Sequence, residues 1–118
     1  MATEQDVWRI STALPGVTEG TWYGTPGYKV AGKGFLRLRT EAEGALVVLV
    51  ADEGEKAALI NDEPATFFTT PHYDGRSVVL VNLDTVQVDE LEELITESWR
   101  KKAPAKLVAE LDRRFSDS

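Results

Sequence analysis

The 118-residue chain contains no cysteine, one histidine and one methionine. Disulfides, thiolate nucleophiles and cysteine-ligated metals are therefore excluded. Its longest apolar run, residues 45–51, is far below the roughly 20 residues that a membrane-spanning helix needs. No basic start precedes an apolar stretch, so we expect no signal peptide, no membrane association and a cytoplasmic location.

Basic residues are also scarce, since 13 Lys and Arg stand against 20 Asp and Glu, for a formal net charge of -7. Proteins that bind nucleic acids draw much of their affinity from lysine and arginine side chains that neutralise phosphates. A globally acidic protein repels DNA, although salt screens this repulsion beyond about 10 Å. Nucleic-acid binding would thus require a local basic patch.

The length and the 42% hydrophobic content fit one globular domain over residues 1–118, because two halves would each be too small to hold a core. Thr3 and Asp6 resemble a capping box, and Val7, Ile10 and Leu14 follow at helical spacing. We expect this first helix to end at residues 15–16, Pro-Gly.

Short extended segments come next, and we expect strands at residues 21–24, 28–30, 34–39 and 45–50. The tripeptide Thr-Pro-Gly at 25–27 should break the first pair, and residues 31–34 should form a hairpin turn. The strand at 45–50 is apolar on both faces, which predicts a place in the middle of the sheet.

The second half alternates helices and strands. Asp52 and Glu55 predict the start of a short helix, and strands are expected at 67–68 and 77–82. Asp89 with Glu92 should cap a third helix with an apolar stripe that ends at Trp99, and residue 104, a proline, should open the last helix. The predicted fold is α+β, an antiparallel β-sheet backed by helices.

Three segments resemble a known family. They are LPGVTEGTWYGTPGYKVAGKGF at residues 14–35, FFTTPHYDG at 67–75 and VLVNLD at 79–84, followed by a helix that ends in ESWR at 97–100. Together they are similar to the MmcQ/YjbR family of small bacterial proteins over residues 8–106. The resemblance implies a compact domain similar to CyaY and frataxin-like proteins. It also implies DNA binding, in which two β-hairpin wings grip a duplex.

Two basic clusters are candidates for such binding. Residues 20–40 contain four basic residues and no acid, a local charge of +4, and a second cluster lies near residues 100–106. Either cluster can also be an ordinary solvated sheet face or the lysines favoured at a helix C-terminus. As candidate nucleic-acid contacts we single out Lys29, Lys33, Arg37, Arg39, Lys101 and Lys102.

Aromatic residues define an alternative site. A groove lined by Trp22, Tyr23, His72 and Tyr73 would suit a small anionic ligand or a protein partner. His72 could also act as a general base, but no nucleophile stands in a recognisable arrangement with it, and a loop histidine packed on its own turn is the simpler interpretation. We therefore expect a non-enzymatic, monomeric protein with no catalytic residues and no cofactor.

Acidic residues gather on the predicted third helix. Frataxin-like proteins bind iron through helical carboxylates, and the resemblance makes a metal-binding ridge conceivable. Acids near a helix N-terminus are equally stabilised by the helix dipole, so a solvated helix face is the preferred interpretation and no metal site is expected. The residues concerned are Glu90, Glu92, Glu93 and Glu97.

Overall fold

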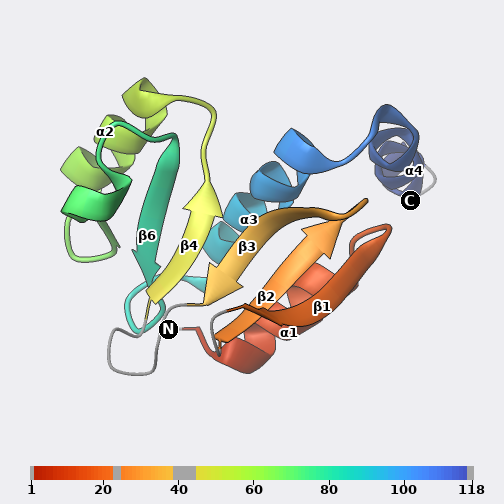
Figure 1. The fold of residues 1–118 in the computed structure, drawn as a ribbon, viewed down its shortest axis with the longest axis horizontal. Helices are drawn as coiled ribbons and strands as arrows, with labels where there is room; N and C mark the ends of the chain where they lie inside the picture. Colours follow the sequence, from red (N-terminus) through yellow and green to blue (C-terminus); the bar gives the residue numbers. More distant parts are fainter. Residues whose placement is uncertain (1, 23–24, 39–44, 117–118) are drawn as a thin grey trace.

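The computed structural model describes residues 2–22, 25–38 and 45–116. The chain runs from a helix into a four-strand meander, a short helix, two strands and two further helices, in the predicted order (Figure 1). The elements are α1 Glu4–Thr12, β1 Val17–Trp22, β2 Thr25–Val30, β3 Lys33–Leu38, β4 Ala45–Leu49, α2 Glu53–Asp62, β5 Phe67–Phe68, the 3₁₀-helix η1 Pro71–Tyr73, β6 Val78–Asn82, α3 Val88–Lys102 and α4 Ala105–Ser116.

Within the described residues the strands form one six-stranded sheet in the order β1-β2-β3-β4-β6-β5, and every neighbouring pair is antiparallel. This confirms the α+β prediction. It also confirms the interior position of the apolar strand at 45–50, because β4 lies between β3 and β6. In the described part of the chain, no helix combines the length and the apolarity needed to cross a membrane.

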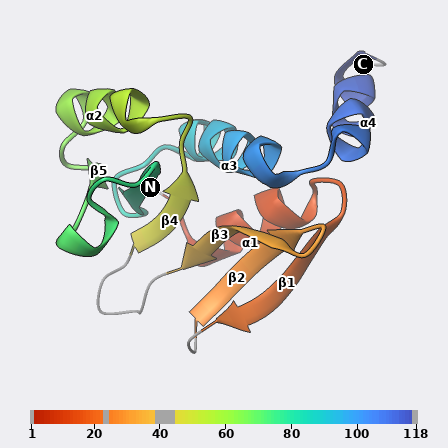
Figure 2. The ribbon, with the colours of Figure 1, turned by 45° about the horizontal axis from the view of Figure 1, so that its top comes forward.

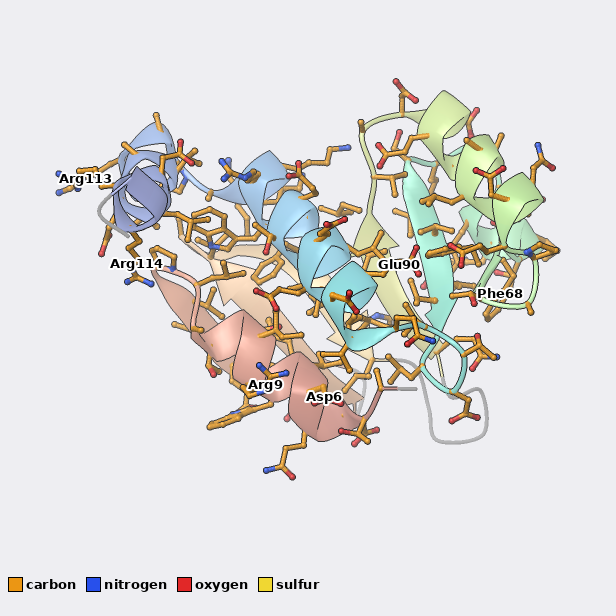
Figure 3. The ribbon with its side chains drawn as sticks, turned by 180° about the vertical axis from the view of Figure 1, so that it is seen from behind. Asp6, Arg9, Phe68, Glu90, Arg113 and Arg114 are labelled. Atoms are coloured by element: carbon orange, nitrogen blue, oxygen red, sulfur yellow. The ribbon has the colours of Figure 1, made fainter. Side chains whose placement is uncertain are left out.

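Helices cover one face of the sheet. Figure 1 looks onto the strands with α1 and α3 behind them, and Figure 3 shows the same two helices from the other side. We call this side the helix-covered face and the opposite side the open face. In Figure 2, α2 flanks the end of the sheet that carries β5, whereas α4 lies at the other end of the molecule.

The first helix forms as its sequence predicts. Thr3 Oγ1 accepts from the backbone N–H of Asp6 at 3.2 Å, and the Asp6 carboxylate accepts from the N–H of Thr3 at 2.9 Å. This reciprocal pair satisfies two N–H groups that would otherwise lack partners. Val7 and Ile10 then point into the core between α1 and the sheet.

Four local boundaries differ from prediction. β1 begins at Val17, four residues early, and residues 25–27 lie inside β2, where Pro26 pairs with Thr21 of β1. The third helix begins at Val88 after Gln87, so Asp89 belongs to its first turn and does not cap it. The last helix starts at Ala105, just after the proline expected to open it.

A β-bulge in β3 joins the sheet to α3. Lys29 pairs with Gly34 and Tyr28 with Leu36, which leaves Phe35 as an extra residue. Phe35 and Leu36 are both buried on the helix-covered face. The hydroxyl of Ser98 donates to the Phe35 carbonyl and accepts from the backbone N–H of Leu49 at 3.0 Å, so one side chain satisfies both strands beside the bulge.

Trp99 fills the centre of the core with 0% exposure. Its indole Nε1 donates to the carbonyl oxygen of Pro15 at 3.1 Å, across 84 residues of sequence. The tryptophan therefore ties the end of α3 to the turn that leads from α1 into β1. Residues from the first and last of the recognised sequence segments meet at this contact.

Candidate functional site

The open face is divided between two surfaces. One register row crosses the sheet through Gly20, Gly27, Arg37, Val47, Leu80 and Phe68, in strand order. On β4, β6 and β5 the row is apolar and joins a small cluster with Ala45 and Tyr73. On β1 and β2 it consists of glycines, of which Gly20 is exposed and Gly27 is buried. Arg37 stands at the border between the two.

The side chain of Arg37 is held in place by η1. Its Nη2 donates to the hydroxyl oxygen of Tyr73 at 2.7 Å, and Tyr73 is only 6% exposed. The arginine is half-buried, so its guanidinium lies against the sheet instead of extending freely into water. A positioned guanidinium loses less conformational entropy when it binds an anion than a free one does.

A buried lysine in turn fixes the backbone around Tyr73. Lys56, from α2, is 6% exposed. Its Nζ donates to the carbonyl oxygens of Tyr73 at 2.7 Å and of Arg76 at 3.1 Å. The exposed ring of His72 meets the ring of Tyr73 edge-on, with centroids 4.8 Å apart. Sequence reasoning missed Lys56, because a lysine inside a charged helix gives no sign that it is buried.

The β2–β3 hairpin presents further basic residues. Ala31 and Gly32 both have positive φ, 51° and 77°, as a tight two-residue hairpin turn requires. The turn lies where it was predicted but is shorter, because Lys33 and Gly34 already belong to β3. Lys33 is exposed just after this turn, and Lys29 is half-buried on β2. Because the bulge adds one residue to β3, Lys29 and Arg37 share the open face.

The second basic cluster lies at the C-terminal end of α3, which packs on the opposite side of the sheet. Lys101 Nζ donates to the carbonyl oxygen of Val50, while Lys102 is exposed. Val50 follows β4, whose end runs beside the start of β3. Lys33 and Lys101 therefore lie at the same end of the β3 and β4 strands. Lys101 and Lys102 do not lie on the open face with Arg37. Neighbouring Arg100 pairs with Glu97 and Asp112.

Part of the predicted site falls outside the described residues. Tyr23 and Arg39 belong to that part, and so does the side chain of Trp22, whose backbone pairs with Thr25 at the end of β1. Of the predicted aromatic groove, the described contact is the one between His72 and Tyr73. Figure 3 places Phe68 at one end of the molecule and Arg113 and Arg114 of α4 at the other.

The acidic residues of α3 surround a small cavity of about 180 Å³ between α2 and α3, which Glu55, Glu90, Glu93 and Glu97 line together with leucines. Burial, together with the hydrogen bond and the negative charge of Glu63, raises the pKa of Glu90 to about 7. Among the described residues, no three or more acidic or histidine side chains are grouped to hold a metal ion.

Comparison with known sequences identifies the protein family of this chain. The YjbR family model matches residues 12–101, and the chain belongs to the YjbR family. It is 44% identical over 121 residues to uncharacterized proteins of Mycobacterium tuberculosis and Mycobacterium bovis, and the match covers 92% of this chain and 94% of each relative. The resemblance inferred from the sequence segments is thereby confirmed.

A solved structure shares the fold. The crystal structure of Deinococcus radiodurans protein DR2400, which carries a DUF419 domain, superposes with a TM-score of 0.71. The two sequences are 24% identical, and the match covers 84% of this chain and 77% of that one. At this identity the likeness concerns the arrangement of helices and strands alone.

Proposed function

We propose that this YjbR-family protein is a non-enzymatic binding protein that takes an anionic partner, DNA, on the open face of its sheet. The observation that supports this best is the Arg37 guanidinium, positioned by the Tyr73 hydroxyl on the face opposite α1 and α3. Lys29 shares that face, and Lys33 stands exposed at the adjoining hairpin turn.

The local charge favours an anion despite the net charge of -7. The described hairpin, residues 25–38, contains Lys29, Lys33 and Arg37 and no acidic residue. At physiological salt the screening length is about 8 Å, so a phosphate on the open face interacts mainly with Arg37 and Lys29, while Lys33, which pairs with the buried Val30, adds a cation at the turn. The acids elsewhere in the chain weaken the encounter through the negative net charge.

The shape of the open face favours the backbone of a polymer. Gly20 is exposed and has open space where a side chain would stand, whereas Gly27 beside it on β2 is buried. A phosphate chain can approach the sheet closely at Gly20. Among the described elements, no helix is presented by this surface for insertion into a groove, so we propose contacts to phosphates without base readout.

The test is the affinity for a fluorescent 20-base-pair duplex, measured by anisotropy at low and physiological salt. Arg37→Glu and Lys33→Glu should each weaken binding about tenfold or more at low salt, because phosphate contacts are electrostatic. The matched control is Arg9→Glu, the same charge change on α1, where Arg9 pairs with Asp6 on the helix side (Figure 3). Its effect should stay below twofold. Absence of binding at low salt, or equal losses in all three variants, would rule out this function.

A small anionic ligand is a second candidate, supported by the contact of Tyr73 with both Arg37 and the ring of His72. A guanidinium binds phosphate or carboxylate with two parallel hydrogen bonds. Titration with inorganic phosphate should shift the His72 ring signals in the NMR spectrum, and Arg37→Gln should abolish the shift. Phosphate binding without any affinity for the duplex would favour this candidate over DNA.

A further inference from the structure

A groove of about 400 Å³ lies on the helix-covered side, between α1 and the β1–β2 hairpin. Its volume falls in the range typical of small-molecule sites. Trp8, Pro26 and Leu38 supply apolar walls, and Glu4, Glu19 and Tyr28 supply the polar groups. Of these residues, Tyr28 and Leu38 belong to the hydrophobic core, and the others do not.

Trp8 is the most unusual member of this groove. It is 48% exposed, and it is the one large hydrophobic side chain that lies exposed among the described residues. It follows Val7 and falls off the buried stripe of α1, so the packing of the helix does not require it. Glu4 precedes it by one helical turn, which places both side chains on the same side of α1.

The polar groups converge from the other wall. Glu19 on β1 pairs with Tyr28 on β2, and Tyr28 is 2% exposed. Burial raises the pKa of Tyr28 to about 12, with smaller contributions from the charge and hydrogen bond of Glu19 and from the charge of Glu4. Both carboxylates therefore act on the same phenol, which stays protonated at neutral pH.

The described lining contains two carboxylates and no basic residue. The nearest cation on α1, Arg9, is paired with Asp6 at 3.5 Å and is not part of the lining. An aromatic face beside carboxylates is the arrangement that attracts organic cations, because the ring and the carboxylates act in the same direction.

We propose that this groove binds a small organic cation, an ammonium group that carries apolar substituents, with Trp8 as its aromatic face and Glu4 and Glu19 as its counter-charges. The apolar substituents contact Pro26 and Leu38. The groove uses residues on the helix-covered face, whereas Arg37 and Lys29 face the other side. The two sites are therefore independent and have opposite charge preferences.

Choline and its uncharged isostere 3,3-dimethylbutan-1-ol provide the test by isothermal titration calorimetry on the full chain. Choline should bind at millimolar or lower concentration and the alcohol should not, because only the charge differs between them. Trp8→Ala should weaken choline binding about tenfold, in line with the loss of a cation–π contact. Glu19→Gln should weaken it severalfold while the amide oxygen still accepts from the Tyr28 hydroxyl.

Glu92→Gln is the matched control, because it removes one charge from the exposed side of α3 and does not line this groove. Its effect on choline binding should be under twofold. Circular dichroism should show Trp8→Ala to be folded, since the side chain is half exposed. Equal affinity for choline and the alcohol, no binding of either, or equal losses in Glu19→Gln and Glu92→Gln would overturn the proposal.

A second arm distinguishes a free cation from a lipid headgroup with the same chemistry. Phosphatidylcholine vesicles are sedimented with the wild-type protein and with Trp8→Ala. Sedimentation that depends on Trp8 would assign the ammonium group to a lipid. Binding of free choline without sedimentation would assign it to a soluble cation.

Discussion

The two faces of the sheet are built from alternate residues of the same strands, yet they differ in almost every property. The helix-covered face packs the sheet against α1 and α3 around Trp99 and Ile95. The open face buries only a small cluster around Tyr73 and Leu80 and continues over glycines. We infer that the first face carries most of the stability, which leaves the second free to present charged groups.

Replacement of Trp99 should show the largest difference. Trp99→Ala should lower the free energy of unfolding by about 3–5 kcal/mol, because it leaves a large cavity and the Pro15 carbonyl without its donor. Trp8→Ala, on the exposed side of α1, should cost under about 1 kcal/mol. Urea denaturation measures both, and similar losses would contradict the assignment of the core to Trp99.

Lys56 tests the support of the open face. Lys56→Met should lower the free energy of unfolding by about 1–2 kcal/mol, because two carbonyl groups lose a buried donor. Amide hydrogen exchange near Tyr73 and Arg76 should accelerate more than exchange in α3. Lys106→Met, on the exposed surface of α4, is the control and should change stability by less than about 0.5 kcal/mol.

Glu90 makes the helix-covered side sensitive to pH. Its pKa is raised from 4.5 to about 7 in the folded protein, so the folded state binds more protons than the unfolded chain between these values. Stability from this group is complete below pH 4.5 and is lost as the pH rises to about 7.

Glu90→Gln should remove this loss and raise the free energy of unfolding at pH 8 by on the order of 1–2 kcal/mol. The control is Glu92→Gln, an exposed acid on the same helix. Urea denaturation between pH 4 and 8 gives the comparison. A pH dependence that is the same in both variants would show that Glu90 is not its source.

The hairpin turn should give the smallest effect. Gly32 has a φ of 77°, which an alanine adopts at a cost of about 1–2 kcal/mol, so Gly32→Ala should destabilise by about 1 kcal/mol. Gly20→Ala meets no atom within 4 Å and should be neutral or slightly stabilising. Thermal unfolding separates them, and a larger cost at Gly20 would show that the glycine half of the open face is not free.

The sequence predicted the elements better than the contacts between them. The helical spacing of the apolar residues and the capping box were sufficient to predict α1, because Thr3 and Asp6 lie close together in the sequence. The cap expected at Asp89 was wrong because the chain enters α3 at Gln87 in an extended conformation without a side-chain cap. The residue types at Thr3–Asp6 and at Asp89–Glu92 both resemble a capping box, so the local sequence could not show that only the first is one.

The contacts within the candidate site were harder to predict from the sequence. The arginine candidate Arg37 was recognised from local charge, but its bond to Tyr73 spans 36 residues and depends on the bulge at Phe35. Alternation with the buried Leu36 and Leu38 places Arg37 on the open face, whereas the burial of Phe35 beside Leu36 departs from alternation because of the bulge. The groove at Trp8 likewise requires α1 and the β1–β2 hairpin to meet, which no local pattern encodes.

Gly16 affects how the last helix packs against the rest of the protein. Its φ is 68°, and a side chain there would meet Leu107 of α4 at 2.6 Å, while Arg114 donates to the Ala13 carbonyl at 2.9 Å. The last helix, which lies beyond the residues matched by the family model, is thus seated on the turn that closes the first. An alanine at position 16 would have to adopt the same positive φ and displace the end of the Leu107 side chain, so it should weaken the packing of α4 against this turn.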